Sequence, residues 1–501
     1  MFLQLLAFSP LLLLPLLFFI LKLSGDSKTA NSKLPKSYPI IGSFPAIYKN
    51  RSNRFPWITD LVKTSPTSTI SMHHSPGHRI VITANPAVVQ HILKTKFHIY
   101  QKGKSFRTTL QDLLGDGIFN ADGDNWKFQR QLSSHEFNTK SLRKFVEQVV
   151  DTELYDRLVP ILSKSSSNRT VLDFQDILQR FAFDNICKIG FGYDPEYLLP
   201  SLPQAKFAVA FDDAVQISGE RLNSMRIVWK IKRAFGIGSE SHLRRVVSEV
   251  RQFANTIVKQ KKSEMDEMKT SESHDLLSRF LSSGHSEEKF VTDIVISFIL
   301  AGRDTTSAAL TWFFWLIANH PNVEDEILKE INEKVETGAG YDEAKDMVYT
   351  HAALCESMRL YPPVPTDGKE AVEDDVLPDG TEVKKGTTVS YHVYAMGRME
   401  QIWGEDWAQF RPERWLEHDM AADKWKFVAK DSFSYPVFQA GPRICLGKEM
   451  AFLQMKRVVG GVLKRFKIVP EKRENGKEPE FVGYLTGKMK GGFPVTVVER
   501  A

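Results

Sequence analysis

One cysteine of this chain lies where its thiolate could do chemistry. Cys445 is one of three cysteines among 501 residues. A cysteine is usually a small buried hydrophobe, but here Gly441 and Gly447 let the backbone turn tightly around the sulfur. Arg443 offers a forked donor for a carboxylate, and the helix expected after Gly447 would direct its positive end at the sulfur. The run is Phe438-Gln439-Ala440-Gly441-Pro442-Arg443-Ile444-Cys445-Leu446-Gly447.

A thiolate next to a carboxylate clamp suits haem, with the sulfur on iron and Arg443 on a propionate. Phe438, Gly441, Arg443, Cys445 and Gly447 fill the pattern F-x-x-G-x-R-x-C-x-G, which resembles the haem-binding signature of the cytochrome P450 family. The resemblance implies haem b (iron-protoporphyrin IX) as cofactor, with Cys445 as the metal ligand and the other four residues in the cofactor site. It also implies the use of dioxygen and of electrons that come from NADPH through a reductase.

A second candidate site lies in the long apolar segment 290–318. Two charges in its middle, Arg303 and Asp304, would each cost about 2.5–3.5 kcal/mol at a bilayer centre, so burial in a protein is favoured over a membrane span. A threonine in mid-helix can bond the carbonyl one turn back and open the helix locally. The alternative is a polar kink without chemistry. The segment 301–306 resembles the family's A-G-x-D-T motif, which implies that Thr305 and Asp304 are catalytic and deliver protons to dioxygen.

Two further motifs carry charged pairs. Glu356 and Arg359 are three residues apart on a predicted helix, where an isolated pair is normally worth little. Arg414 lies in a later segment, Phe410-Arg411-Pro412-Glu413-Arg414-Trp415. Together these resemble the family's E-x-x-R helix and P-E-R segment. The resemblance implies a structural ion network of Glu356, Arg359 and Arg414 behind the haem.

Trp126 and Arg130 are one helical turn apart. The alternative to a binding role is an ordinary amphipathic helix. By resemblance to the family's W-x-x-x-R helix, both are expected to bind haem propionates, and Lys369 is a further propionate partner.

The N-terminal segment is apolar. No residue from Phe2 to Leu21 is charged, and about 20 apolar residues can cross a bilayer as a helix. A cleavable signal peptide is the alternative, but its apolar core is about 7–15 residues long. Lys22, Lys28 and Lys33 follow the span, and positive flanks stay cytoplasmic. We predict a transmembrane anchor over 1–23, a proline-rich hinge over 24–45 and a haem-thiolate domain over 46–501. This makes the chain a single-pass protein of the endoplasmic reticulum membrane, with its catalytic domain in the cytosol.

Composition and pattern indicate a mainly α fold with a small β portion. Hydrophobic residues make up 42% of the chain and the net charge is +5. Three scattered cysteines argue against a secreted disulfide scaffold. The sequence also has no basic stripe interleaved with aromatic residues, so it gives no indication of nucleic-acid binding. Apolar periodicity predicts helices over 85–96, 140–163, 171–190, 240–268, 290–320, 322–335 and 347–360. Strands are expected over 69–70, 80–83, 383–394 and 494–498. The resemblance implies the P450 fold, a helix-rich triangular prism around a buried haem.

The resemblance also implies partners. No flavin or ferredoxin module is recognisable, so a separate NADPH–cytochrome P450 reductase in the same membrane is expected to supply electrons to a monomer. Its basic docking face is expected at Lys127, Arg130, Lys140, Lys448 and Lys456, with a merely solvated surface as the alternative.

Several stretches resemble plant fatty-acid ω-hydroxylases: 126–131, 391–398 and 438–443. The expected substrate is a fatty acid hydroxylated at its terminal or near-terminal carbon, and the alternative is a jasmonoyl–amino acid conjugate. The channel is expected to be lined by 102–119, the helix around Phe298, 364–367 and 483–488. A cation among Lys102, Lys104 and Arg107, in a predicted loop, is expected to hold the substrate carboxylate.

Two other function classes compete with a monooxygenase. A haem-thiolate isomerase or dehydratase of hydroperoxides needs neither dioxygen nor a reductase, and a haem sensor or carrier needs no acid–alcohol pair. The intact pair Asp304–Thr305 argues against both.

Overall fold

The computed structural model describes residues 34–500, apart from 39–40, 76–77, 138–139, 268–274, 284–286, 336–346, 421–423, 474–475 and 477. The predicted anchor over 1–23 and the first part of the predicted hinge lie outside the described residues. Across the ranges that the structure describes, no helix combines the length and the apolar character needed to cross a bilayer.

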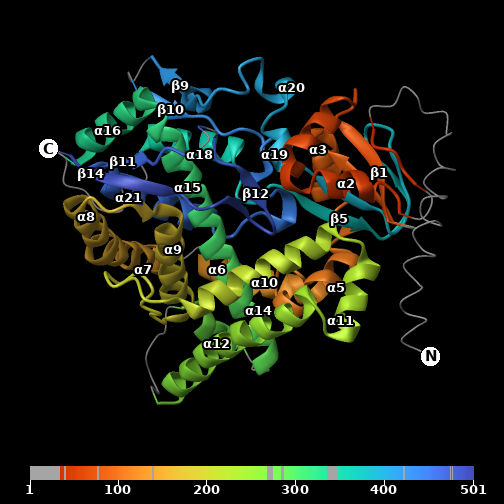
Figure 1. Ribbon diagram of the computed structural model, residues 1–501, viewed down its shortest axis with the longest axis horizontal. Coiled ribbons are helices and arrows are strands. Elements are labelled where there is room, and N and C mark those ends of the chain that lie inside the picture. Colours follow the sequence, from red (N-terminus) through yellow and green to blue (C-terminus); the bar gives the residue numbers. More distant parts are fainter. Residues whose placement is uncertain are drawn as a thin grey trace.

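Helices dominate the molecule (Figure 1). The α-helices are α2 (Phe44–Lys49), α3 (Arg54–Lys63), α4 (Pro86–Gln90), α5 (Gly103–Leu114), α6 (Gly123–Phe137), α7 (Lys140–Thr152), α8 (Val159–Asn168), α9 (Phe174–Phe191), α10 (Lys206–Asn223), α11 (Arg226–Phe235), α12 (Ser239–Glu267), α13 (Leu276–Ser282), α14 (Glu288–Ile299), α15 (Thr305–Ala318), α16 (Pro321–Val335), α18 (Val348–Leu360), α19 (Val393–Met396), α20 (Glu400–Trp403) and α21 (Lys448–Leu463). Three π-helical segments, η3 (His91–Thr95), η4 (Glu153–Leu158) and η5 (Leu300–Asp304), continue α-helices. Short 3₁₀ turns are η2 (Arg51–Asn53), η6 (Pro412–Trp415), η7 (Pro436–Phe438) and η8 (Gly441–Arg443).

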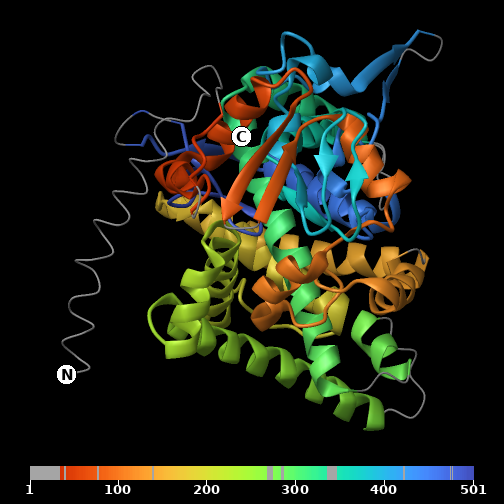
Figure 2. The ribbon, with the colours of Figure 1, turned by 90° about the vertical axis from the view of Figure 1, so that its right-hand side faces the viewer.

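The strands form one larger sheet and several small ones. The five-stranded sheet has the order β1-β2-β8-β5-β3, in which β2 and β8 are parallel and the other pairs antiparallel. Figure 2 shows β1 and β2 (orange) beside strands from the last third of the sequence (cyan). The strands are β1 (Thr69–Ser75), β2 (His78–Thr83), β3 (Tyr100–Gln101), β4 (Leu172–Asp173), β5 (Asp367–Ala371), β6 (Asp375–Val376), β7 (Glu382–Val383), β8 (Thr388–Tyr391), β9 (Leu416–Asp419), β10 (Lys424–Phe427), β11 (Phe466–Pro470), β12 (Phe481–Gly483), β13 (Gly487–Met489) and β14 (Pro494–Glu499).

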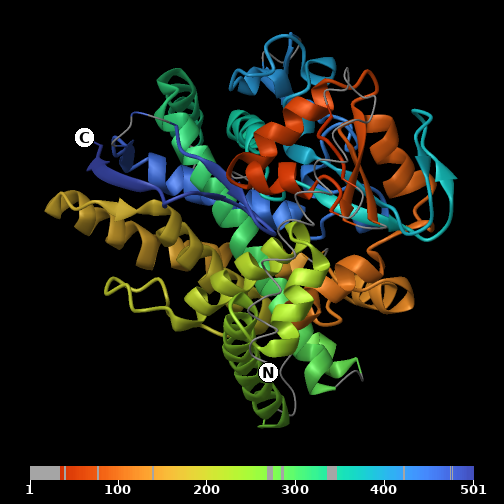
Figure 3. The same ribbon diagram turned by 45° about the vertical axis from the view of Figure 1, so that its right-hand side comes forward.

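The central helix organises the core. The run α14–η5–α15 passes through the middle of the molecule (Figure 3), and α15 packs against α9, α18 and β13. Nearly all of its side chains are buried, including Trp312, Phe313 and Phe314. One large apolar cluster lies around α15, α18 and α21, and a second lies between α5, α9, α10, α12 and α14. Because the run α14–η5–α15 contributes residues to both clusters, it can hold side chains at a site between them.

The predicted class, mainly α with a small β portion, is confirmed. The predicted helix 290–320 is present, but with the π-helical segment η5 in its middle. The predicted helix 171–190 begins only at Phe174, because Leu172 and Asp173 pair with β14 and the Asp173 side chain caps α9. The prediction of one strand over 383–394 is wrong: β7, a turn, β8 and α19 share that range. The prediction of a loop at Lys102–Arg107 is wrong: Lys102 is the N-cap of α5, and the residues from Gly103 onward form its first turns.

Candidate active site

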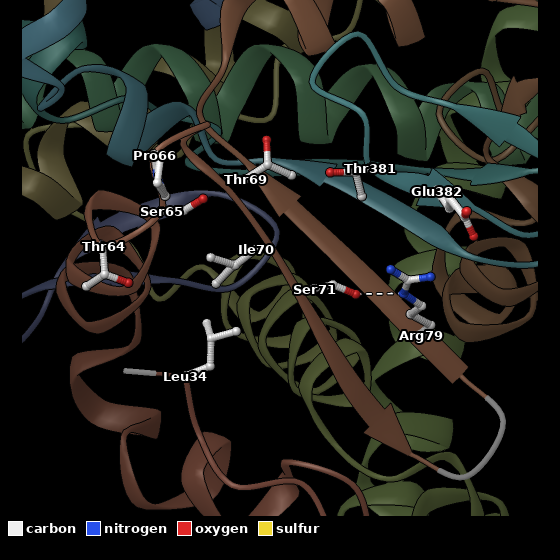
Figure 4. A pocket seen from close by; sticks show the side chains of 10 residues that line it. All are labelled: Leu34, Thr64, Ser65, Pro66, Thr69, Ile70, Ser71, Arg79, Thr381 and Glu382. Atoms are coloured by element: carbon white, nitrogen blue, oxygen red, sulfur yellow. Dashed lines mark hydrogen bonds between the residues drawn. The ribbon is translucent and has the colours of Figure 1, made fainter. Parts of the chain in front are cut away.

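The chemistry-bearing residues line one internal cavity of about 480 Å³. All four segments predicted to line a channel contribute to it, through Phe106, Leu114, Phe298, Val364 and Leu485 among others. A second pocket, of about 720 Å³, lies beside β1 and β2 (Figure 4). Its lining contains no cysteine and a single acidic residue, Glu382, and its one drawn hydrogen bond joins Arg79 Nε to Ser71 Oγ at 2.6 Å. Size alone would favour that second pocket, but the smaller cavity is the candidate site because it holds the thiol.

Tight turns aim Cys445 into the cavity. η7 and η8 precede it, and the Cys445 N–H donates to the Phe438 carbonyl at 2.8 Å. Gly441 has φ +64°, and a Cβ there would lie 2.0 Å from the Leu93 carbonyl oxygen, so only glycine fits. Gly447 then forms the N-cap of α21. The sequence therefore specifies this loop locally, as predicted.

The Cys445 side chain is exposed within a protein-lined space. Burial raises the pKa of its thiol, although the Gly447 N–H and the charges of Arg130 and Lys448 act in the opposite direction. A coordinating metal deprotonates a thiol outright. Cys445 is therefore a neutral, accessible thiol until a metal binds it.

Four cations surround the cavity beside this loop. Arg443 donates to the Ala121 carbonyl at 3.0 Å and to Asp122 Oδ1 at 2.8 Å, and its guanidinium lies 4.5 Å from the centroid of the Trp126 ring. Arg130 donates to the Ile444 carbonyl. The structure thus brings Trp126, Arg130 and Arg443 together, as expected from their motifs.

Lys369 and Lys102 share one carboxylate. Their ammonium groups lie 2.8 Å from Asp367 Oδ2 and Oδ1, respectively. Asp367 also accepts from Gln439 Nε2 at 2.9 Å, and although burial opposes it, these cations hold its pKa well below the ordinary value. Asp367 ends the segment 364–367 that was predicted to line the channel, but its ion pairs were not predicted, because no local pattern reveals that two lysines will converge on it.

The charges around the thiol fit a dianion. Four cations (Lys102, Arg130, Lys369 and Arg443) face two carboxylates, Asp122 and Asp367, which leaves two positive charges in excess when Lys369 is protonated. Burial lowers the pKa of Lys369 to about 7 and also lowers that of Arg443. Among the described residues, the buried Arg443 Nε has no hydrogen-bond partner. Haem carries two propionates, so the residues present fit this group in charge as well as in their thiol ligand.

Thr305 lies on the cavity wall formed by the central helix. Its hydroxyl donates to the Ala301 carbonyl at 2.6 Å, at the end of the π-helical segment η5. Gly302 packs closely there, since a Cβ would lie 2.4 Å from the Ile186 side chain. The predicted local opening of the helix is present, and it leaves a polar hydroxyl on an otherwise apolar wall.

Asp304 points away from the cavity into a buried chain of charges. Arg303 Nη1 lies 2.7 Å from Asp304 Oδ1 and 2.6 Å from Asp212 Oδ1. Thr486 donates to Asp304 at 3.3 Å, and Lys488 lies 2.8 Å from Asp212. Although burial opposes it, the charges of Arg303 and Lys488 hold the pKa of Asp212 at about 2. The chain leads from the acid next to Thr305 to the partly exposed Asp212.

The ion network of Glu356, Arg359 and Arg414 is formed. Arg359 Nε and Nη2 lie 2.8 and 2.7 Å from the two oxygens of Glu356, and Arg414 Nε lies 3.1 Å away. Trp415 Nε1 also donates to Glu356, at 2.9 Å. Glu356 and Arg359 are fully buried. The network joins α18 to η6, two segments that are far apart in the sequence.

A third group of acids is structural. Ligand atoms of Glu153, Asp184 and Asp194 lie within 4.8 Å of one another, the spacing of a metal site. Arg157 contacts all three acids, and Lys188 contacts Glu153 and Asp194. These cations already occupy the position that a metal would need, so the cluster ties α9 to η4 and is no candidate centre.

The sequence matches the family profile of Cytochrome P450 over residues 33–492. It is 64% identical over 479 residues to cytochrome P450 94A2 of Vicia sativa, which covers 95% of this chain and 93% of the relative. It is 48% identical over 498 residues to cytochrome P450 94B1 of Arabidopsis thaliana, with 98% and 97% coverage. This family uses haem b on a cysteine thiolate, dioxygen and reductase-supplied electrons of NADPH. The thiol loop and the excess of positive charge, which would balance two propionates, agree with these matches. The chain belongs to the cytochrome P450 family as a haem-thiolate monooxygenase.

Proposed function

We propose that this enzyme hydroxylates fatty acids at the terminal or near-terminal carbon. The observation that carries the proposal is the cavity lining: apolar side chains from four separate segments line a space that also contains Thr305 and Cys445. The segments contribute Phe106, Leu114, Phe298, Val364 and Leu485. An alkyl chain gains about 0.8 kcal/mol for each buried CH₂, so such a lining favours a long apolar tail. In this proposal the methyl end of that tail lies beside Thr305.

The residues around the thiol divide into two roles in this proposal. Cys445 binds the haem iron, while Trp126, Arg130, Arg443 and Lys369 hold the propionates. Phe438, Gly441 and Gly447 shape the loop and keep the thiolate next to N–H donors. When bound, the haem supplies the activation of dioxygen and the insertion of one oxygen atom into a C–H bond. Glu356, Arg359 and Arg414 fix the protein framework behind it.

Thr305 and Asp304 handle protons in this proposal. The Thr305 hydroxyl can turn from the Ala301 carbonyl into the cavity and donate there. Asp304 is its neighbour and connects through Arg303 to Asp212 near the surface. A positioned proton donor contributes about 10²–10⁴ to a rate. Although burial opposes it, Asp212 and Asp304 raise the pKa of Arg303, so Arg303 keeps its proton and holds the two carboxylates in place, while Asp304 is the group that exchanges protons in this proposal.

Replacing Thr305 with alanine tests this role. We expect kcat for fatty-acid hydroxylation to fall by at least about tenfold, while the haem content and the reduced, CO-bound spectrum stay unchanged. Thr305→Ser keeps a hydroxyl at the same position and is the matched control, so it should retain most of the activity. Equal loss in both variants would show that the methyl group of Thr305, and not its hydroxyl, matters.

A product analysis tests the substrate class. The full-length protein, together with an NADPH–cytochrome P450 reductase, should convert saturated and unsaturated long-chain acids to products hydroxylated at or near the methyl end. Faster turnover of a jasmonoyl–amino acid conjugate would contradict the fatty-acid assignment and favour the alternative. Consumption of a fatty-acid hydroperoxide without NADPH would identify an isomerase or dehydratase, and a thiolate-type spectrum without any turnover would point to a sensor.

Association with the endoplasmic reticulum membrane is part of the same proposal. Apolar side chains are exposed on α11 and just after it: Ile227, Val228, Ile231, Phe235 and Ile237. An apolar patch on a surface helix that also carries lysines suits an anionic lipid surface. The predicted anchor over 1–23 would hold the enzyme at that surface next to its reductase.

The predicted docking face for the reductase is smaller than expected. Lys456 is buried, which corrects its assignment to a surface. Arg130 lines the cavity, so it is not available to a partner. Lys127 is exposed and pairs with Asp124, and Lys448 is half-buried. The side chain of Lys140 lies outside what the structure describes, so that part stays a prediction, and Lys127 and Lys448 remain as a proposed basic contact for an acidic partner.

A further inference from the structure

Two arginines line the cavity from elements other than the thiol loop. Arg54 begins α3 and Arg226 begins α11. Figure 1 shows α3 and α11 on the opposite side of α15 from α21, the helix that follows Cys445. The cavity lining therefore contains these two arginines in addition to the cation cluster around Cys445.

Neither arginine has a carboxylate partner among the described residues. Arg54 Nη2 donates to the Gly483 carbonyl at 3.0 Å, and its guanidinium lies 4.8 Å from the centroid of the Phe55 ring. Arg226 donates to Ser105 Oγ and lies 3.3 Å from His78 Nε2.

Burial lowers the pKa of both arginines, that of Arg54 to about 10. Glu370 is near enough to Arg226 to oppose that effect, but its carboxylate accepts the Ser105 N–H at 3.1 Å.

The other arginines and lysines that line the cavity lie next to a carboxylate or to Cys445. Lys102 and Lys369 share Asp367, Arg221 pairs with Asp112 and Glu240, and Arg443 pairs with Asp122. Arg130 lies beside Cys445, at the proposed propionate end. The N–H groups of a half-buried guanidinium without an anion must form their hydrogen bonds to water. A bound carboxylate would accept two of these hydrogen bonds at once.

The cations predicted from the sequence to hold the substrate are placed elsewhere. Lys102 is buried and tied to Asp367. Lys104 is exposed on α5, and Arg107 lies 3.5 Å from Asp116. None of the three is left as a free anion-binding group in the cavity.

We propose that Arg54 and Arg226 bind the carboxylate of the substrate in the cavity. This inference rests on the proposed function, since it assigns the acid group of the fatty acid to these two residues. With its acid group fixed there, the chain lies along the apolar lining and its methyl end reaches the wall that carries Thr305. The distance between the two arginines and that wall then selects which carbon is oxidised.

The test compares an acid with its methyl ester. The full-length haem-containing protein and its Arg54→Gln/Arg226→Gln variant are titrated with dodecanoic acid and with methyl dodecanoate, following the haem absorption. We expect the Kd of the acid to rise at least about tenfold in the variant, which corresponds to about 1.4 kcal/mol. The Kd of the ester should change by less than about twofold. In turnover, KM for the acid should rise more than kcat falls, and hydroxylation should spread inward from the chain end.

Controls separate anchoring from folding. A Kd does not depend on the fraction of protein that folds, so partial misfolding of the variant does not affect the comparison. Lys104→Gln removes an exposed cation from the same region and should leave both values unchanged. Arg54→Lys/Arg226→Lys keeps the charges and should restore part of the affinity for the acid.

Two results would overturn the inference. Equal weakening of acid and ester would mean that the arginines only shape the cavity, and unchanged affinity for the acid would exclude them as its anchor. Failure of the proposed function looks different, because the wild-type enzyme would then not oxidise dodecanoic acid at all. In that case the same acid–ester comparison, made with a jasmonoyl conjugate, decides whether the two arginines still bind a carboxylate.

Discussion

Cys445→Ser abolishes the thiolate-type spectrum of the reduced, CO-bound enzyme and its monooxygenase activity together. The expected loss of turnover is at least about a hundredfold, or ~2.7 kcal/mol of transition-state stabilisation. The reason is electronic: a thiolate donates electron density to iron and favours cleavage of the O–O bond. A serine hydroxyl stays protonated near pH 7 and cannot replace it. The loop itself should survive, since the hydrogen bond from residue 445 to the Phe438 carbonyl uses the backbone.

Cys187→Ala is the matched control for this experiment. Cys187 is fully buried away from the cavity lining, and burial raises the pKa of its thiol well above the ordinary value. Its replacement should therefore leave the spectrum and the turnover unchanged. A normal thiolate-type spectrum in Cys445→Ser, or its loss in Cys187→Ala, would contradict the assignment of Cys445 as the iron ligand.

Glu356→Ala destabilises the fold by about 3–5 kcal/mol, the usual consequence of removing one partner from a buried ion network. Two arginines and the Trp415 N–H converge on this carboxylate, so its loss leaves buried donors without acceptors. A urea titration followed through the haem absorption measures the change. We expect a lower midpoint, an unchanged slope and less haem-containing protein from the same culture.

Two further variants serve as controls for Glu356→Ala. Glu417→Ala removes an exposed acid from β9 and should change the stability by less than about 0.5 kcal/mol. Glu356→Gln keeps an acceptor for Trp415 but removes the negative charge, so it should lie between the wild type and Glu356→Ala. If Glu356→Ala were as stable as Glu417→Ala, the network would not hold α18 to η6.

Local sequence predicted the thiol loop because its causes are local. The φ of +64° at Gly441, the turns before Cys445 and the helix after Gly447 all lie within a few residues. The long central helix was predicted for a similar reason, since its apolar side chains recur along one continuous segment. The opening at η5 follows from the Thr305 hydroxyl, which bonds a carbonyl one turn back.

Element boundaries were less accurate where neighbours in space decide. The range 383–394 has the composition of one strand, but pairing with β5 and β2 confines the larger sheet's strand there to Thr388–Tyr391. Val393–Met396 then turns into α19, whose side chains are buried among other elements. No pattern inside the segment records where those partners end.

The partners of the site residues depended wholly on the tertiary structure. Lys102 was one of three cations predicted to hold the substrate, yet it pairs with Asp367, a residue 265 positions away. Asp304 was predicted to act beside Thr305, and the structure adds that its side chain contacts Arg303 and Thr486. Arg54 and Arg226 attracted no attention in the sequence, because only the folded chain shows that neither forms an ion pair with a carboxylate among the described residues.

The sequence by itself was enough to predict the chemistry of this protein: a cysteine ligand, an acid–alcohol pair and the residue types that would hold a haem. These depend on short motifs whose geometry is set by backbone turns and one helix. Only the tertiary structure decided which cations around the cavity are neutralised and which stay without an anion, because an ion pair depends on distances between segments that lie far apart in the chain. The distribution of charge in the cavity affects the orientation of the bound substrate, while the thiol loop determines the reaction that the substrate undergoes.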